Sequence, residues 1–156
     1  MITINLPRKE SIVLEHLVVD YNGTLAIDGN IIEGVKEILN ELSEKIKIHV
    51  VTADTFGKVK ENLKDVNCQV LIISSEIEYI EKVSYIEDLD EEKVIAIGNG
   101  RNDSLLLKEA AIGIAVIQKE GTSFKTLMNA DIVCTSIIDA LELVKYPLRL
   151  TATLRK

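Results

Sequence analysis

The sequence contains few of the features on which secreted, membrane-bound or metal-clustered proteins depend. Its only cysteines, Cys68 and Cys134, are far apart and lack neighbouring histidines, so they do not form a metal or redox motif. We expect two reduced, buried thiols. No apolar run approaches the roughly 18 residues that a membrane-spanning helix needs, and residues 1–10 do not resemble a signal peptide. These absences favour a cytoplasmic protein without a membrane partner.

Positive charge is also scarce. The chain has 18 Lys and Arg against 25 Asp and Glu, for a formal net charge of -7. A chain this acidic is a poor candidate for binding the phosphate backbone of nucleic acid. Any phosphate site must therefore obtain its positive charge locally, from a metal ion or a lysine. The two histidines, His16 and His49, lie in or beside predicted strands, and we interpret them as structural.

Short apolar runs alternate with helix-period stretches along the chain. Strands are predicted at residues 14–19, 46–51, 70–73, 94–97, 112–116 and 132–134. Helices are predicted at residues 31–42, 56–63, 76–89, 104–110, 123–128 and 137–144. This alternation indicates a doubly wound, mostly parallel sheet of about five or six strands, in three α/β/α layers. Without repeats, low-complexity stretches or linkers, residues 1–156 are predicted to form one domain.

The two ends of the chain are predicted separately. Residues 2–6 alternate apolar and polar side chains, which is typical of an edge strand or of a hairpin with the segment after Lys9. Pro147 is predicted to end the last helix. The basic tail at residues 148–156 is expected to be a surface strand or a packed extension rather than an interaction arm.

Polar clusters follow three of the predicted strands, where ligands bind in open parallel sheets. They cover residues 20–24, 52–54 and 98–103. The carboxylate of Asp20 can attack phosphorus if a cation suppresses charge repulsion, or it can simply cap the next element. Gly23 permits a sharp turn that aims main-chain groups at a ligand.

The other polar side chains also have two interpretations each. Thr52 can donate a hydrogen bond to a phosphate oxygen, or it can cap the helix predicted to start near Phe56. Asp103 can supply a hard oxygen ligand for Mg²⁺, or it can cap the helix that follows its Asn/Gly-rich turn. Lys82 can screen phosphate charge, or it can be an ordinary solvated lysine on a helix face.

Taken together and in order, these segments resemble the four sequence motifs of the haloacid dehalogenase (HAD) superfamily. The matching segments are Asp20-Tyr21-Asn22-Gly23-Thr24-Leu25, Thr52-Ala53-Asp54, Lys82 and Gly98-Asn99-Gly100-Arg101-Asn102-Asp103. Lys93 is the alternative to Lys82 as the third motif. The run at residues 105–116 also fits the superfamily. The gaps between the motifs leave no room for a cap domain, and the chain is most similar to the small, capless, soluble P-type ATPase-like members.

The resemblance implies a Rossmann-like core that forms one catalytic domain and hydrolyses phosphate esters. It implies that Asp20 accepts the phosphoryl group, with Lys82 as the second catalytic residue. The implied ligands of Mg²⁺ are Asp20, the carbonyl group of Asn22, Asn99 and Asp103. The implied phosphate-binding residues are Gly23, Thr52, Ala53, Asn102 and Lys82.

Two residues depart from the pattern of the superfamily. Asn22 stands where most of its phosphatases carry an acid that protonates the leaving group and later activates water. Such help is worth about 10²–10⁴-fold in rate, so we expect a slow enzyme. Asn99 stands in place of the usual metal-binding aspartate, which leaves Asp103 to contribute more of the negative charge.

Three functions follow from these expectations. The first is a slow Mg²⁺-dependent phosphatase that acts on a phosphorylated small molecule or phosphoprotein. The second is a regulatory module that binds phosphate or a phosphoprotein and seldom turns over. The third is a sugar-phosphate phosphatase whose site is covered by a neighbouring subunit, in contact with residues 26–30 of a homo-oligomer. ATP-driven transport is not expected, because the sequence shows neither membrane helices nor a nucleotide-binding insert.

Overall fold

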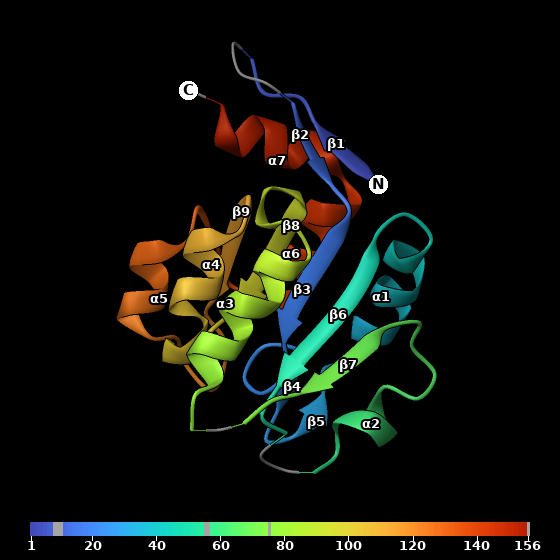
Figure 1. Ribbon diagram of the computed structural model, residues 1–156. Helices are drawn as coiled ribbons and strands as arrows, with labels where there is room; N and C mark the ends of the chain where they lie inside the picture. Colours follow the sequence, from blue (N-terminus) through green and yellow to red (C-terminus); the bar gives the residue numbers. More distant parts are fainter. Residues whose placement is uncertain (8–10, 55–56, 75, 156) are drawn as a thin grey trace.

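A six-stranded, fully parallel sheet forms the centre of the protein (Figure 1). The structure is a computed structural model that describes residues 1–7, 11–54, 57–74 and 76–155. The strand order is β10-β9-β8-β3-β6-β7. The strands are β3 (His16–Asp20), β6 (Lys47–Thr52), β7 (Gln69–Ile72), β8 (Val94–Gly98), β9 (Ile112–Val116) and β10 (Ile132–Cys134). Within this sheet the first strand in the chain is β3; β6 and β7 follow on one side of it, and β8, β9 and β10 on the other, so the direction of winding reverses between β3 and β8. The predicted doubly wound parallel sheet is confirmed.

Helices cover both faces of the sheet, as predicted. One face carries α1 (Val35–Ser43) and α6 (Ile137–Lys145), which contact each other and the strands. The other face carries α3 (Glu78–Asp88), α4 (Ser104–Glu109) and α5 (Phe124–Asn129). The short helix α2 (Val59–Asn62) lies between β6 and β7 in the chain.

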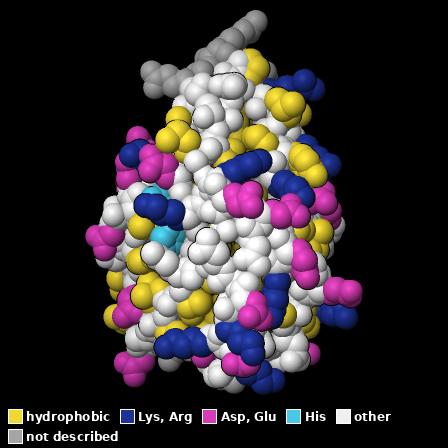
Figure 2. Space-filling view, turned by 90° about the vertical axis from the view of Figure 1, so that its right-hand side faces the viewer, with side chains coloured by type: hydrophobic (Ala, Val, Ile, Leu, Met, Phe, Trp, Pro, Cys, Tyr) yellow, Lys and Arg dark blue, Asp and Glu magenta, His cyan; other side chains and the backbone are white. Residues whose placement is uncertain are grey.

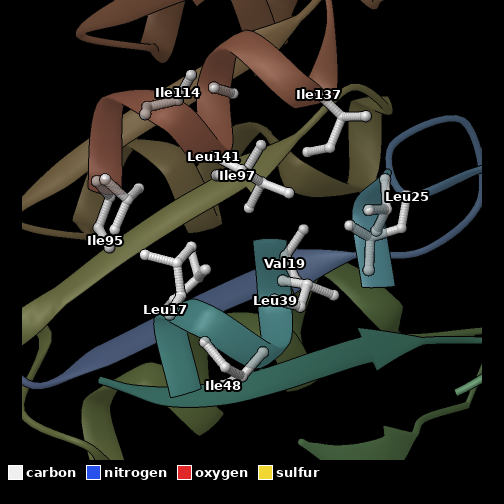
Figure 3. Packing of buried hydrophobic residues seen from close by; sticks show 14 of the residues in the cluster. Leu17, Val19, Leu25, Leu39, Ile48, Ile95, Ile97, Ile114, Ile137 and Leu141 are labelled. Atoms are coloured by element: carbon white, nitrogen blue, oxygen red, sulfur yellow. The ribbon is translucent and has the colours of Figure 1, made fainter. Parts of the chain in front are cut away.

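Alternation along the strands assigns each side chain to one of two cores. Leu17 and Val19 of β3 pack with residues of α1 and α6, as Figure 3 shows for Leu39 and Leu141. Val18, between them, belongs to the core under α3 and α4. Because side chains in a strand alternate between faces, Asp20 at the end of β3 lies on the same face as Val18. That is the face covered by α3.

The ends of the chain form a separate layer at the far end of the sheet. The strands β1 (Ile2–Ile4) and β2 (Ile12–Leu14) pair antiparallel, which confirms the hairpin; Lys9 lies outside the described residues. The tail is a packed extension, one of its two predicted alternatives, and not a surface strand. Helix α6 ends just before Pro147, but Pro147 does not follow the last helix: it begins another, α7 (Pro147–Leu154), which packs against β1. Proline is well suited to the first turn of a helix, where its missing N–H needs no partner.

Two predicted helices are shorter than expected. Helix α1 begins at Val35 because residues before it form a small hairpin, β4 (Ala26–Ile27) with β5 (Asn30–Ile31). We call residues 26–31 the flap hairpin. The helix predicted at 56–63 is only α2, and Phe56 lies outside the described residues. Across the described ranges, no helix has the length and apolar character needed to cross a bilayer.

A hydrogen-bonded chain of three rings links the sheet to α3. Nδ1 of His16 is 2.9 Å from Nε2 of His49, and Nδ1 of His49 is 2.8 Å from the Tyr85 hydroxyl. Histidine atoms reach the surface beside a basic side chain on the face shown in Figure 2. Burial, followed by the charges of His16 and Lys47, lowers the pKa of His49 to about 4. Both rings therefore serve the fold in their neutral form.

The histidine pair makes stability depend on pH. Unfolded His49 binds a proton near its ordinary pKa of 6.5, whereas folded His49 binds one only near pH 4. The stabilisation is therefore complete above about pH 6.5 and is lost as the pH falls toward 4, by about 1–3 kcal/mol. Urea unfolding at several pH values measures this loss. A His49→Gln variant should show a smaller loss over the same range, and parallel curves for the two proteins would contradict the assignment.

Candidate active site

The three polar loops predicted from the sequence meet at one edge of the sheet. Asp20 ends β3, Thr52 ends β6 and Gly98 ends β8. These strands are neighbours in the sheet and run parallel. The edge also lies where the winding direction reverses between β3 and β8, which is the usual ligand position in doubly wound sheets.

Helix periodicity brings Lys82 to Asp20. Asp20 points to the face covered by α3, and on that helix Glu78, Lys82 and Ile86 lie four residues apart, on one side. Ile86 packs into the core, and this anchors the same side of the helix against the sheet. The lysine is carried inward with it and is fully buried, which is rare for lysine unless it is paired.

The ammonium group of Lys82 lies among three carboxylates. Its Nζ is 2.8 Å from Asp20 Oδ1, 2.6 Å from Asp103 Oδ1 and 3.1 Å from Glu78 Oε1. Burial by itself would lower the pKa of Lys82, but the carboxylates together outweigh burial and raise it. Burial and the Asp103 carboxylate raise the pKa of Asp20 to about 7, although Lys82 acts in the opposite direction. One ammonium group therefore does not neutralise this cluster.

Asp103 organises the loop between β8 and α4. Its Oδ2 accepts hydrogen bonds from the main-chain N–H groups of Asn99, at 3.0 Å, and Gly100, at 2.9 Å. Its Oδ1 contacts Lys82, so both oxygens are already bonded within the protein. The side chain does not cap α4. In this arrangement Asp103 holds the loop and the lysine, and its predicted role as a metal ligand stays a prediction.

The loop after β3 packs directly on the loop after β8. Thr24 donates a hydrogen bond from its hydroxyl to Asn99 Oδ1, at 3.0 Å, and lies 3.3 Å from Asp20 Oδ2. Gly23 has a φ of 77°, and a Cβ there would lie 2.4 Å from Asn99 Nδ2. Glycine at this position therefore permits both the turn and the close approach of Asn99.

Asn22 and Thr52 face each other across the site. The Asn22 Nδ2 group lies 3.5 Å from the Thr52 hydroxyl oxygen, which also accepts a hydrogen bond from the main chain of Asp54, at 3.0 Å. The side chain that binds the start of α2 is that of Asp54 and not that of Thr52, because Asp54 Oδ1 accepts hydrogen bonds from Lys58 N and Val59 N. Ala53 lies between them and is half-buried.

The structure places Lys82, and not Lys93, at the predicted site. Lys93 pairs with Asp90 at 3.2 Å and Glu15 at 3.7 Å, at the amino ends of the strands. Asn102 is half-buried and lines a cavity between α3 and α5, described below. The contact of Asn102 with phosphate stays a prediction.

Sequence reasoning missed three residues that build the site. Thr24 was noted only as part of a motif, and Glu78 only as part of a helix; its position four residues before a lysine was the available signal. Gln118 had no local signal. Its Nε2 donates to the carbonyl groups of Gly23 and Thr24, at 3.1 and 2.8 Å, and its Oε1 accepts from Ile137 N. It ties the first loop to the start of α6.

The donors around Asp20 fit a hard divalent cation. Three carboxylates share one ammonium group, and Asn22 Oδ1 is buried without a hydrogen-bond partner among the described residues. Within those residues, no three His, Cys, Asp or Glu side chains are grouped to hold a metal. A cation here would instead be held by carboxylate, amide and main-chain oxygens together with water, a set that Mg²⁺ accepts.

Two curated relatives come from Methanocaldococcus jannaschii. An uncharacterised protein is 50% identical over 82 residues, which are 50% of this chain and 88% of that protein. Phosphoserine phosphatase is 29% identical over 136 residues, and the match covers 73% of this chain and 62% of that enzyme. The chain thus spans less than two thirds of the phosphatase. No protein-family model matches the chain.

Solved structures share the architecture over most of the chain. The 3-deoxy-D-manno-octulosonate 8-phosphate phosphatase of Moraxella catarrhalis, with magnesium, phosphate and KDO, has a TM-score of 0.70 at 17% identity, covering 89% of this chain and 90% of that one. The cobalt-bound phosphatase of Haemophilus influenzae has a TM-score of 0.71 at 9% identity, covering 89% and 91%. A putative HAD superfamily hydrolase of Legionella pneumophila has a TM-score of 0.64 at 14% identity, covering 90% and 87%.

These likenesses define the fold class as the doubly wound α/β core of HAD proteins. The predicted motif residues Asp20, Thr52, Lys82 and Asp103 occur in the expected order and meet at one edge of that core. The chain has the fold of haloacid dehalogenase superfamily hydrolases, and it carries residues that resemble their motifs. Among the described residues, the segments between Asp20 and Lys82 form the flap hairpin, α1, β6, α2, β7 and the start of α3, and none of these is a cap domain. The narrower similarity to P-type ATPase-like proteins stays a prediction.

Removing the Lys82 charge should destabilise the metal-free fold. A Lys82→Met variant keeps the apolar stem but leaves Asp20 and Asp103 as buried carboxylates without their cation. We expect a loss of about 3–5 kcal/mol in the free energy of unfolding by urea. Lys64→Met is the matched control, because Lys64 forms an exposed pair with Glu61 that is worth less than about 1 kcal/mol. Equal losses in the two variants would contradict the structural role of Lys82.

Proposed function

We propose that the protein is a slow, divalent-cation-dependent phosphatase that forms an aspartyl-phosphate on Asp20. The observation that carries this proposal is the contact between Asp20 and Lys82 at the carboxyl edge of β3, 2.8 Å apart and shielded from water. A carboxylate in this position can attack phosphorus, and the buried ammonium group can stabilise the negative charge of the transferring phosphoryl group.

The reaction has two steps. An oxygen of Asp20 bonds to phosphorus while the bond to the leaving oxygen breaks, and a proton must reach that leaving group. Water then attacks the aspartyl-phosphate, which releases inorganic phosphate and restores the carboxylate. Lys82 remains charged through both steps because the pKa of its ammonium group is raised. Thr52, whose hydroxyl faces the same edge, and Asn102 are the proposed hydrogen-bond donors to the phosphate.

Mg²⁺ is the proposed cation, held by Asp20, the main-chain carbonyl group of Asn22 and Asn99. When bound, it would supply the positive charge that lets one anion approach another. Three features of the chain support cation binding here. The carboxylates are not fully neutralised, Thr24 orients the Asn99 amide by a hydrogen bond, and Gly23 lets the two loops approach closely. Relatives in fold contain magnesium or cobalt, which supports a divalent ion.

The missing acid at Asn22 limits the rate. The Asn22 amide lies beside Thr52 and cannot exchange protons as a carboxylic acid does. Two nearby acids are engaged in other contacts and are poorly placed to replace the missing proton donor. Asp103 binds Lys82 and the loop after β8, and Asp54 binds the start of α2. This observation favours a second candidate, a phosphate-binding module that seldom turns over. The named activities of the relatives support a phosphorylated small molecule, either as the substrate of the phosphatase or as the ligand of the binding module.

Hydrolysis of p-nitrophenyl phosphate tests the proposed chemistry. We expect turnover with Mg²⁺ that is abolished by a chelator and lowered by about 10³-fold or more in Asp20→Asn, which removes the nucleophile but keeps its shape. Circular dichroism checks that the variant is folded. If the folded wild-type protein is no faster than Asp20→Asn, a general phosphatase is excluded, and phosphate binding measured by calorimetry would then support the binding module.

Restoring the acid should accelerate the enzyme on poor leaving groups. An Asn22→Asp variant places a carboxyl group beside the site, and general acid catalysis contributes about 10²–10⁴-fold when well aligned. We expect at least about a tenfold gain in kcat on an alkyl phosphate such as glycerol 3-phosphate, and a smaller gain on p-nitrophenyl phosphate, whose leaving group needs no proton. Asn22→Ser, which cannot act as an acid at neutral pH, is the control. A gain in Asn22→Ser, or none in Asn22→Asp, would contradict the explanation.

A further inference from the structure

A surface cavity is lined by residues of α3, α4, α5 and the loop after β8. It has a volume of about 460 Å³ and lies between the amino ends of α3 and α5. Its lining residues are Tyr79, Arg101, Asn102, Ser104, Leu105 and Lys125. Two of them are basic and none is acidic, in a chain whose net charge is -7. The cavity is therefore a locally positive site in a negatively charged protein.

The walls of the cavity are the direct neighbours of active-site residues. Asn102 precedes Asp103, and Tyr79 follows Glu78, and both of these carboxylates contact the Lys82 ammonium group. The cavity and the Lys82 cluster thus share two segments of the chain, the start of α3 and the loop after β8, and Arg101 and Lys125 line the cavity. Neither of these two basic residues forms an ion pair with any other described residue.

The main chain around Lys125 is held by hydrogen bonds to the loop that carries Arg101. Thr126 donates its hydroxyl to the Gly100 carbonyl group at 2.6 Å, and Ser123 N donates to the Asn99 carbonyl group at 2.9 Å. On the other side, the buried Ser104 hydroxyl lies 3.4 Å from the Lys125 carbonyl oxygen. The start of α5 is thus held against the loop after β8.

We propose that this cavity selects phosphate esters that carry a second anionic group, a carboxylate or a second phosphate. The inference deepens the proposed function and rests on it for the position of the first phosphate. Arg101 binds the distal anion through its planar guanidinium group, Lys125 adds a second positive charge, and the exposed ring of Tyr79 forms the outer wall. Arg101 and Lys125 are thus specificity-determining residues and do not take part in bond breaking.

The test compares two substrates that differ in one group. 3-Phosphoglycerate has a carboxylate where glycerol 3-phosphate has a hydroxymethyl group, and fructose 1,6-bisphosphate adds a phosphate to fructose 6-phosphate. We expect kcat/KM to favour the member with the second anion by about 10- to 100-fold in at least one pair. The pair that shows the preference identifies the anion as carboxylate or phosphate. In Arg101→Gln/Lys125→Gln the preference should fall toward 1.

A matched control separates a specific contact from a general loss of positive charge. Lys64→Gln/Lys108→Gln removes two exposed lysines elsewhere and should keep the preference. A preference near 1 in both pairs, or one that survives in Arg101→Gln/Lys125→Gln, would overturn the proposal.

Binding keeps this test independent of turnover. Calorimetry on folded Asp20→Asn with Mg²⁺ measures the dissociation constants of the same four compounds, and the ratio within a pair should again favour the second anion by about 10- to 100-fold. If no Asp20-dependent turnover exists, the proposed function fails, and these ratios alone decide the role of the cavity. Equal affinities within both pairs would overturn the selectivity even if the phosphatase is active.

Discussion

The buried ammonium group of Lys82 is the interaction on which the site depends. Fully removed from water, it is stable only because it contacts Asp20, Asp103 and Glu78 at once. These contacts join α3 to the end of β3 and to the loop after β8. The two strands are neighbours in the sheet but far apart in the sequence. The same ammonium group places a positive charge directly beside Asp20 in an acidic chain.

Two regular periods bring these groups together. The period of 2 in β3 sends Asp20 to the same face as Val18, and the period of about 3.6 in α3 aligns Glu78, Lys82 and Ile86. The parallel sheet then sets the carboxyl ends of β3, β6 and β8 side by side. The strand period, the helix period and the parallel strand pairing all direct these side chains to the same edge. A short chain can therefore assemble a charged site on an apolar core.

The fold and the location of the site could be predicted because they follow from these periods. The strand-ending positions of Asp20, Thr52 and Gly98 were visible as polar residues after apolar runs. Other features depend on contacts between distant segments and left no local signal. Gln118 shows this clearly, since it bonds two carbonyl groups almost a hundred residues earlier in the chain. Pro147 was misread because proline suits both the region after a helix and the first turn of one, and only packing of α7 on β1 decides between them.

The layer formed by the β1–β2 hairpin and α7 has a practical consequence. Figure 1 shows this layer, with the amino end of the chain, at the end of the sheet opposite to the flap hairpin and the carboxyl edge. A fusion partner or a surface attachment at the amino end would leave the opening over Asp20 facing bulk solution. Attachment at the amino end would therefore present the candidate site in the same orientation, facing the surrounding solution, on every molecule.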